Sequence, residues 1–269
     1  MSYKSILVHL DIDEPSSAIV KLGAEIAKRF DARLIGSSAA DAPLPVLTAD
    51  GMVFDGEALQ IQRDGIEKRI EQLRVQFEKL VSGSVKSEWR GAVCDPTRFL
   101  VESARSADLI ITGVTKGSVF RAVDLGALML DAGRPVLVVA SNVEHVLAAT
   151  VLVAWKDTRE ARRAVADALP FLTRAAEVVV AIVDNEPDVS IREGVADVAT
   201  FLGHHGVKAR AEVIGGDNDG SSLISFARSI HADLIVSGAY GHSRLREWVF
   251  GGVTRTLLDE SGINRFMSY

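Results

Sequence analysis

The stretch Ala107-Asp-Leu-Ile-Ile-Thr-Gly113 returns almost residue for residue as Ala232-Asp-Leu-Ile-Val-Ser-Gly238. Each copy is a short apolar run that ends in a hydroxyl residue and a glycine, which is typical of a buried parallel strand. A similar apolar run opens each half of the chain, at residues 5–11 and 150–156. Two copies of one unit explain these matches better than one continuous domain does.

Within each copy, strand patterns alternate with helix patterns, which predicts the α/β class with a doubly wound parallel sheet of five strands. We expect domains at residues 1–143 and 147–269, with extra material in the first copy as a loop around residues 41–56 and a long helix after it. The predicted strands lie near residues 4–10, 33–39, 84–93, 108–113, 135–140, 150–155, 177–183, 208–213, 233–238 and 264–267. Asn264 and Arg265 replace the proline and the apolar residue of the first copy, so we expect the last strand to pair weakly or to lie at an edge.

Composition excludes several classes of protein. The net charge of −6 is shared evenly between the halves, which argues against a nucleic-acid partner. The longest apolar runs have the length of a strand, far short of a membrane span. The single cysteine, Cys94, excludes an internal disulfide and fits a reducing compartment. The first residues run straight into a strand pattern without a signal peptide, so we expect a cytoplasmic protein.

A glycine motif follows the second copy of the repeated strand: Gly238-x2-Gly241-x9-Gly251-Gly252-x-Thr254. Glycines at a strand exit let backbone N–H groups approach an anion, and the second pair opens a helix pattern whose N-terminus favours phosphate. Thr254 adds a hydroxyl. The motif predicts a phosphate cradle, while the alternative of a glycine-rich turn that holds no ligand stays open.

With these features the sequence resembles the universal stress protein family in its tandem, two-domain form. The glycine motif is similar to the family's ATP-binding signature, Gly-x2-Gly-x9-Gly-(Ser/Thr). The resemblance implies an adenine-nucleotide α-hydrolase-like sheet of order 3-2-1-4-5 in each half. It also implies that the two halves pair through their last strands as an intrachain pseudo-dimer; a homodimer is left open. ATP is the implied ligand, with ADP or AMP as alternatives and Mg²⁺ possible beside the nucleotide.

The resemblance also assigns residues of the second copy to the nucleotide site. The phosphate positions match the glycine motif, with Gly252 where the family usually has Ser. Lys156 stands where the family has an aspartate near the ribose, which puts nucleoside recognition in doubt because lysine cannot accept a hydrogen bond. Lys156 could instead reach a phosphate, or Asp157 could substitute. The expected site is Ala154, Lys156, Asp184, Gly238, Gly241, His242, Gly251, Gly252, Val253 and Thr254.

The first copy departs from the signature in the opposite way. Asp11 stands at the aspartate position, but Lys116 replaces the second glycine and Met129 the final hydroxyl residue. We therefore expect one nucleotide per chain, bound by the second copy, and a structural role for the first.

No other chemistry is predicted by the remaining motifs. The six histidines lack metal-ligand spacing, and the chain has no Gly-x-Ser-x-Gly, His-Glu-x2-His or Walker motif. We expect no catalytic residue and no metal site. A binding or signalling module with an unknown protein partner is the leading hypothesis. The alternatives are a weak ATPase or phosphoryl-transfer enzyme and an interaction protein whose site has decayed.

Overall fold

The computed structural model describes residues 2–42, 47–48, 51–52, 56–114, 122–141, 145–146, 148–216, 220–239, 252–259 and 262–269. Contacts divide the chain into two units: unit 2 is residues 4–132, and unit 1 is residues 1–3 together with 133–269. The division places residues 133–143 with the second copy. The domain bounds 1–143 and 147–269 follow from the sequence repeat and remain a prediction. The two units are defined by contacts, so they describe how the chain packs and not where the repeat begins and ends.

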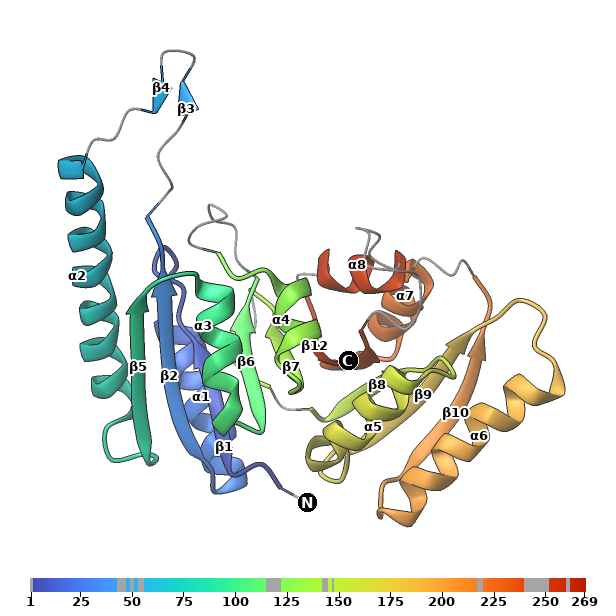
Figure 1. Ribbon diagram of the computed structural model, residues 1–269. Helices are drawn as coiled ribbons and strands as arrows, with labels where there is room; N and C mark the ends of the chain where they lie inside the picture. The colour runs from blue at the N-terminus through green and yellow to red at the C-terminus, as the bar shows by residue number, and fades with distance from the viewer. Residues whose placement is uncertain are drawn as a thin grey trace. The chain divides into compact units, whose positions relative to one another are not determined.

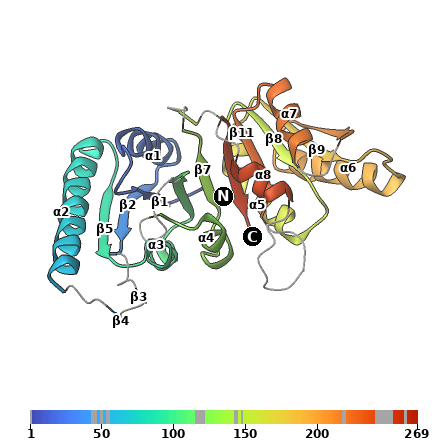
Figure 2. The same ribbon diagram turned by 90° about the horizontal axis from the view of Figure 1, so that it is seen from above.

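Unit 2 holds a parallel sheet of order β5-β2-β1-β6, flanked by helices on both faces. In the view of Figure 2, α1 and α3 lie on opposite sides of β1 and β2. The strands are β1 (Ser5–His9), β2 (Arg33–Ala40), β5 (Ser87–Val93) and β6 (Leu109–Gly113). The helices are α1 (Ser17–Phe30), α2 (Gly56–Val81), α3 (Pro96–Ser103) and α4 (Leu125–Asp131), with a 3-10 turn η1 (Ala104–Ser106) after α3.

The predicted loop around residues 41–56 contains a small antiparallel pair, β3 (Leu47–Thr48) and β4 (Gly51–Met52). Figure 1 shows α2 lying along β5 and continuing past the strand toward this pair. The buried side chains of α2 begin only at Ile66, so its first turns carry no core residue.

One face of the unit 2 sheet is closed by aromatic packing. The rings of Phe77 on α2 and Trp89 on β5 lie 5.5 Å apart between centroids. They press on Gly36 of β2, where an added Cβ would lie 2.7 Å from the Trp89 ring. Gly36 is therefore needed for the close approach of α2.

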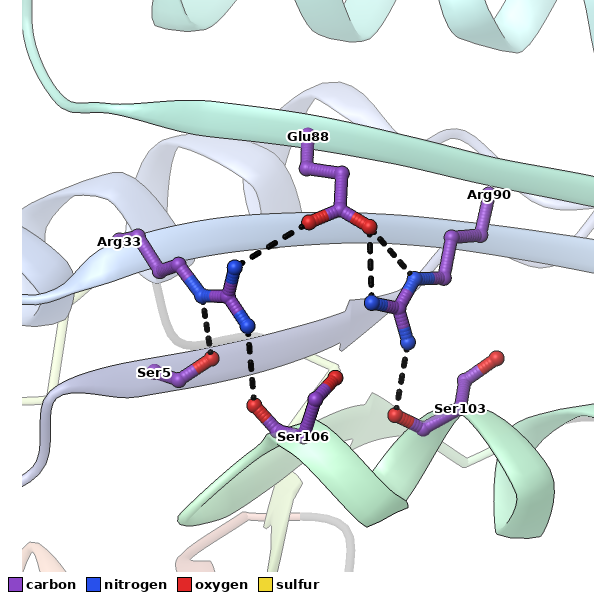
Figure 3. A network of polar contacts seen from close by, with 6 residues as sticks. All are labelled: Ser5, Arg33, Glu88, Arg90, Ser103 and Ser106. Carbon is purple, nitrogen blue, oxygen red and sulfur yellow. Dashed lines mark hydrogen bonds and ion pairs between the residues drawn. The ribbon is translucent and has the colours of Figure 1, made fainter.

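The other face carries the polar network of Figure 3, in which the Glu88 carboxylate joins two arginines, Arg33 at 3.3 Å and Arg90 at 2.7 Å. Arg33 also donates to Ser5 Oγ (3.0 Å) and to the Ser106 carbonyl (3.3 Å), while Arg90 donates to the Ser103 carbonyl (3.0 Å). Cations at the carboxyl end of a helix satisfy carbonyls that lack helical partners. The network fastens the end of α3 and η1 to the sheet.

Unit 1 holds a sheet of order β10-β9-β8-β11-β12-β7. Its first five strands are parallel and have the predicted order 3-2-1-4-5 of one copy. They are β8 (Thr150–Ala154), β9 (Glu177–Val183), β10 (Ala209–Ile214), β11 (Leu234–Gly238) and β12 (Asn264–Ser268), and β7 is Val136–Val139. The helices are α5 (Arg159–Leu172), α6 (Val189–His204), α7 (Ser221–Ser229) and α8 (Gly252–Asp259). The predicted doubly wound α/β fold is confirmed.

The expectation of a weak or edge-lying last strand is wrong. β12 is buried at all five residues and pairs with β11 on one side and, antiparallel, with β7 on the other. The Asn264 side chain accepts from Ala140 N (3.0 Å) and donates to the Asp233 carbonyl (3.2 Å). Arg265 is fully buried and donates to the Ile263 carbonyl (3.0 Å). Both polar side chains make hydrogen bonds within the protein, which is why they can occupy a buried strand.

The first residues of the chain belong to unit 1. Tyr3 donates its hydroxyl to the Asp167 carbonyl of α5 (2.6 Å), and its ring lies 5.7 Å from that of Phe171. Phe171 in turn makes an edge contact with Phe266 of β12 at 6.1 Å. The N-terminal segment is thereby anchored in the aromatic core between α5 and β12.

Candidate functional site

The candidate site lies where the parallel strands β8, β9 and β11 of unit 1 end. Ala154 ends β8, Lys156 follows two residues later, Asp184 follows β9, and Gly238 ends β11. Gly252 begins α8. Carboxyl ends of neighbouring parallel strands meet at one edge of a sheet, which is where ligands bind in such folds. Gly241, His242 and Gly251 lie outside the described residues.

An apolar cluster supports this edge on the side of α7 and α8. Ala154, Val183 and Leu257 belong to it, and Val253 packs against it. Thr254 in the first turn of α8 is 6% exposed. The structure thus brings the predicted residues Ala154 and Val253 into one cluster under the start of α8.

Lys156 is exposed, as is Asp157 beside it. The Asp157 carboxylate forms an ion pair with Arg162, one turn into α5. Asp157 is therefore a surface partner of α5, and its role as a substitute for the missing ribose-binding carboxylate stays a prediction.

The loop after β9 is held by its own polar side chains. Asp184 accepts from the backbone N–H of Glu186 (2.8 Å), which forms a tight turn at the exit of the strand. The next residue, Asn185, accepts from Gly216 N (2.8 Å) and donates to the Gly216 carbonyl (3.3 Å). The exits of β9 and β10 are thereby locked together.

Gly238 has a steric reason to be glycine that the sequence did not reveal. A Cβ there would lie 2.6 Å from Ala161 N and 2.7 Å from Glu160 C, so the first turn of α5 packs directly on its Cα. At the matching position of the first copy, Gly113, a Cβ would meet no atom of the described residues within 4 Å. The absence of a side chain at Gly238 serves helix packing, and its contact with a ligand stays a prediction.

The equivalent edge of unit 2 is acidic. Asp95 and Asp124 cap α3 and α4, accepting from Arg98 N (2.7 Å) and Ala127 N (3.1 Å). With Asp131 and one cation, Arg98, they line an open hollow of about 570 Å³. Carboxylates at helix N-termini occupy the positions that would otherwise attract an anion. Lys116 lies outside the described residues, and Met129 is buried in α4.

A buried histidine ends β1 in unit 2. His9 is 3% exposed, and burial lowers its pKa from 6.5 to about 4, although a backbone hydrogen bond to Ser37 acts in the opposite direction. The imidazole is therefore neutral at pH 7. The sequence analysis noted only that His9 lacks ligand spacing.

Among the described residues, no three acidic, cysteine or histidine side chains gather as metal ligands. No helix in that part of the chain has the length and apolar character required to cross a bilayer.

The fold matches solved structures along the whole chain. A universal stress protein from Archaeoglobus fulgidus DSM 4304 superposes with a TM-score of 0.73 at 17% identity, covering 98% of this chain and 95% of that one. The chain has the universal stress protein fold. A functionally unknown protein from Pseudomonas aeruginosa PAO1 is also similar, with a TM-score of 0.60, 17% identity, and 99% of this chain and 92% of that one covered. No protein-family model matches the sequence, and no curated protein matches it.

Proposed function

We propose that this chain is a stress-response binding or signalling protein that binds one adenine nucleotide at the carboxyl ends of the strands of unit 1. ATP is the favoured nucleotide. The contrast between the copies carries the proposal. Unit 1 places the start of α8, which has no acidic residue in its first turn, above an apolar cluster. The matching edge of unit 2 has three carboxylates, Asp95, Asp124 and Asp131, against one cation, Arg98.

Physical chemistry supports this choice of copy. A helix N-terminus stabilises a phosphate, while carboxylates at the same place repel it. Val253, half-buried against the cluster that contains Ala154 and Val183, offers an apolar contact for a flat base. Lys156 is exposed beside them and supplies a positive charge where the family has an aspartate.

The test is whether the purified full chain carries or binds a nucleotide. We expect mass spectrometry of the denatured protein to release an adenine nucleotide, and calorimetry to give one site per chain. Gly241→Ala and Gly251→Val, which add a Cβ in the glycine motif, should abolish binding without unfolding the protein. Unaltered affinity in both folded variants would show that the motif is not the site.

Lys156 decides how the nucleotide is recognised. If the lysine holds a phosphate, Lys156→Ala should weaken ATP about ten- to a hundredfold and leave adenosine unchanged. If Lys156 only replaces a carboxylate, Lys156→Asp should raise the affinity for every adenosine compound. We favour this second outcome because Lys156 lies just after the end of β8, where the family resemblance places the ribose.

The alternative of a weak ATPase is tested by turnover with Mg-ATP, which we expect to be absent because the sequence contains no Walker, Gly-x-Ser-x-Gly or His-Glu-x2-His motif. A protein partner and a cytoplasmic location complete the proposal.

A further inference from the structure

The two copies differ at the N-terminus of the helix that follows the third strand. An offset of 125 residues pairs Asp95 with Gly220. In unit 2, Asp95 caps α3 through its carboxylate, as described above. In unit 1, α7 has Gly220 at its N-cap, with φ +94° and no side-chain cap, and no acidic residue in its first turn.

The N-termini of α7 and α8 meet in unit 1. A Cβ at Gly220 would lie 3.2 Å from the Cα of Val253 and 3.1 Å from the Cβ of Thr256, both in α8. The N-terminal parts of the two helices are therefore in contact, and neither helix has an acidic residue in its first turn. Their dipoles add to a positive potential at one place.

A buried hydroxyl lies below this meeting point. Ser237 is 4% exposed, and its Oγ has no hydrogen-bond partner among the described residues. Alternation along β11 puts Ser237 on the face of Ile235, which belongs to one apolar cluster with Leu223 of α7 and Leu257 of α8. Ser237 is nearer the carboxyl end of the strand than Ile235 and pairs with Ala154 of the same cluster, so its hydroxyl lies on the face that α7 and α8 cover, at the end of the strand.

In the first copy, the hydroxyl at the equivalent position has a hydrogen-bond partner within the protein. Thr112, the match of Ser237, donates its hydroxyl to the Gly113 carbonyl at 3.3 Å. A buried hydroxyl without a partner loses its hydrogen bonds to water and costs free energy, unless a ligand completes it. Ser237 therefore differs from its counterpart in a way that a bound group would explain.

We propose that Ser237 Oγ and the N-termini of α7 and α8 together bind a phosphate group of the nucleotide. The inference rests on the proposed function and adds to it two phosphate contacts that the glycine motif does not contain, the Ser237 hydroxyl and the N-terminus of α7. Ser237 donates its hydroxyl proton to a phosphate oxygen, and the two helix dipoles stabilise the negative charge.

Calorimetry of the full chain with ADP, tripolyphosphate and adenosine tests the assignment. Ser237→Ala should weaken ADP and tripolyphosphate about tenfold, equivalent to about 1.4 kcal/mol, and leave adenosine unchanged. Thr112→Val, the same deletion in the first copy, should change none of the three affinities.

A second pair of variants tests the contribution of α7. Ser221→Asp places a carboxylate in the first turn of α7, where it should stabilise the helix yet weaken tripolyphosphate severalfold. Ser225→Asp adds the same charge one turn later, on the same exposed face, and should have a much smaller effect on binding.

The outcomes separate the two proposals. Failure of the wild-type chain to bind any of the three compounds refutes the proposed function and this inference with it. Binding of ADP by the wild type with equal affinity in Ser237→Ala refutes only the phosphate position. An equal loss for adenosine and ADP also refutes it, because Ser237 would then contact the nucleoside.

Discussion

Lowering the pH from 7 to 4 should destabilise unit 2 through one side chain, His9. Burial holds the pKa of the folded imidazole at about 4, against 6.5 in an unfolded chain. The unfolded state therefore takes up a proton first as the pH falls, and protonation pulls the equilibrium toward it. The stabilisation is complete above pH 6.5 and is lost as the pH falls from about 6.5 to about 4.

The size of the effect follows from the shift in pKa. Each unit corresponds to about 1.4 kcal/mol, so the lowering at His9 amounts to about 3 kcal/mol. That is a large share of the stability of an ordinary domain, about 5–15 kcal/mol. Other groups also titrate over this range, so the contribution of His9 must be isolated by a variant that cannot take up the proton.

The assay is urea unfolding at pH 7 and pH 4, followed by hydrogen exchange of peptides from β1 and β2 so that unit 2 is read by itself. The loss of unfolding free energy between the two pH values should be about 3 kcal/mol larger in the wild type than in His9→Gln. An NMR titration gives the pKa directly. Equal losses in the two proteins, or a measured pKa near 6.5, would refute the reasoning.

Three further predictions concern unit 1. Gly238→Ala should cost about 1–3 kcal/mol because the new Cβ forces the first turn of α5 away, whereas Gly113→Ala should cost less than about 0.5 kcal/mol; similar costs in thermal unfolding would contradict the packing argument. Tyr3→Phe should cost about 1 kcal/mol, measured by urea unfolding, through loss of the hydrogen bond to Asp167. Asn264→Ala should cost about 2–3 kcal/mol, because it leaves a buried N–H and a buried carbonyl without their partners; wild-type stability in that variant would show that these bonds contribute little.

The alternation and the duplication were readable from the sequence because they depend on local pattern. The apolar runs and their glycine ends indicate strands, and their alternation with helices indicates a parallel sheet. The strand order 3-2-1-4-5 came from the resemblance to the universal stress protein family and not from the alternation. β12 was misjudged because Asn264 and Arg265 look like residues of an exposed edge. Their partners, Ala140, Asp233 and Ile263, become visible only once β7 is known to pair with β12.

The site was predictable only in part, for a related reason. The spacing of the glycines indicated a strand exit and a helix start, but not which backbone each glycine faces. Gly238 faces α5, a contact that no local pattern encodes. The difference between Asp95 and Gly220 was present in the aligned copies and could have been found by extending the comparison beyond the repeated strands.

The discontinuity of unit 1 has a consequence for the order of events during synthesis. Tyr3 leaves the ribosome before unit 2, yet its partners on α5 and the neighbouring β12 are made after the whole of unit 2. At about 5–20 residues per second, that interval lasts on the order of tens of seconds. Unit 2 is continuous and can fold while the chain is still growing. Tyr3 lacks its unit 1 partners meanwhile, and its aromatic ring is a group that a chaperone or a neighbouring nascent chain can reach first.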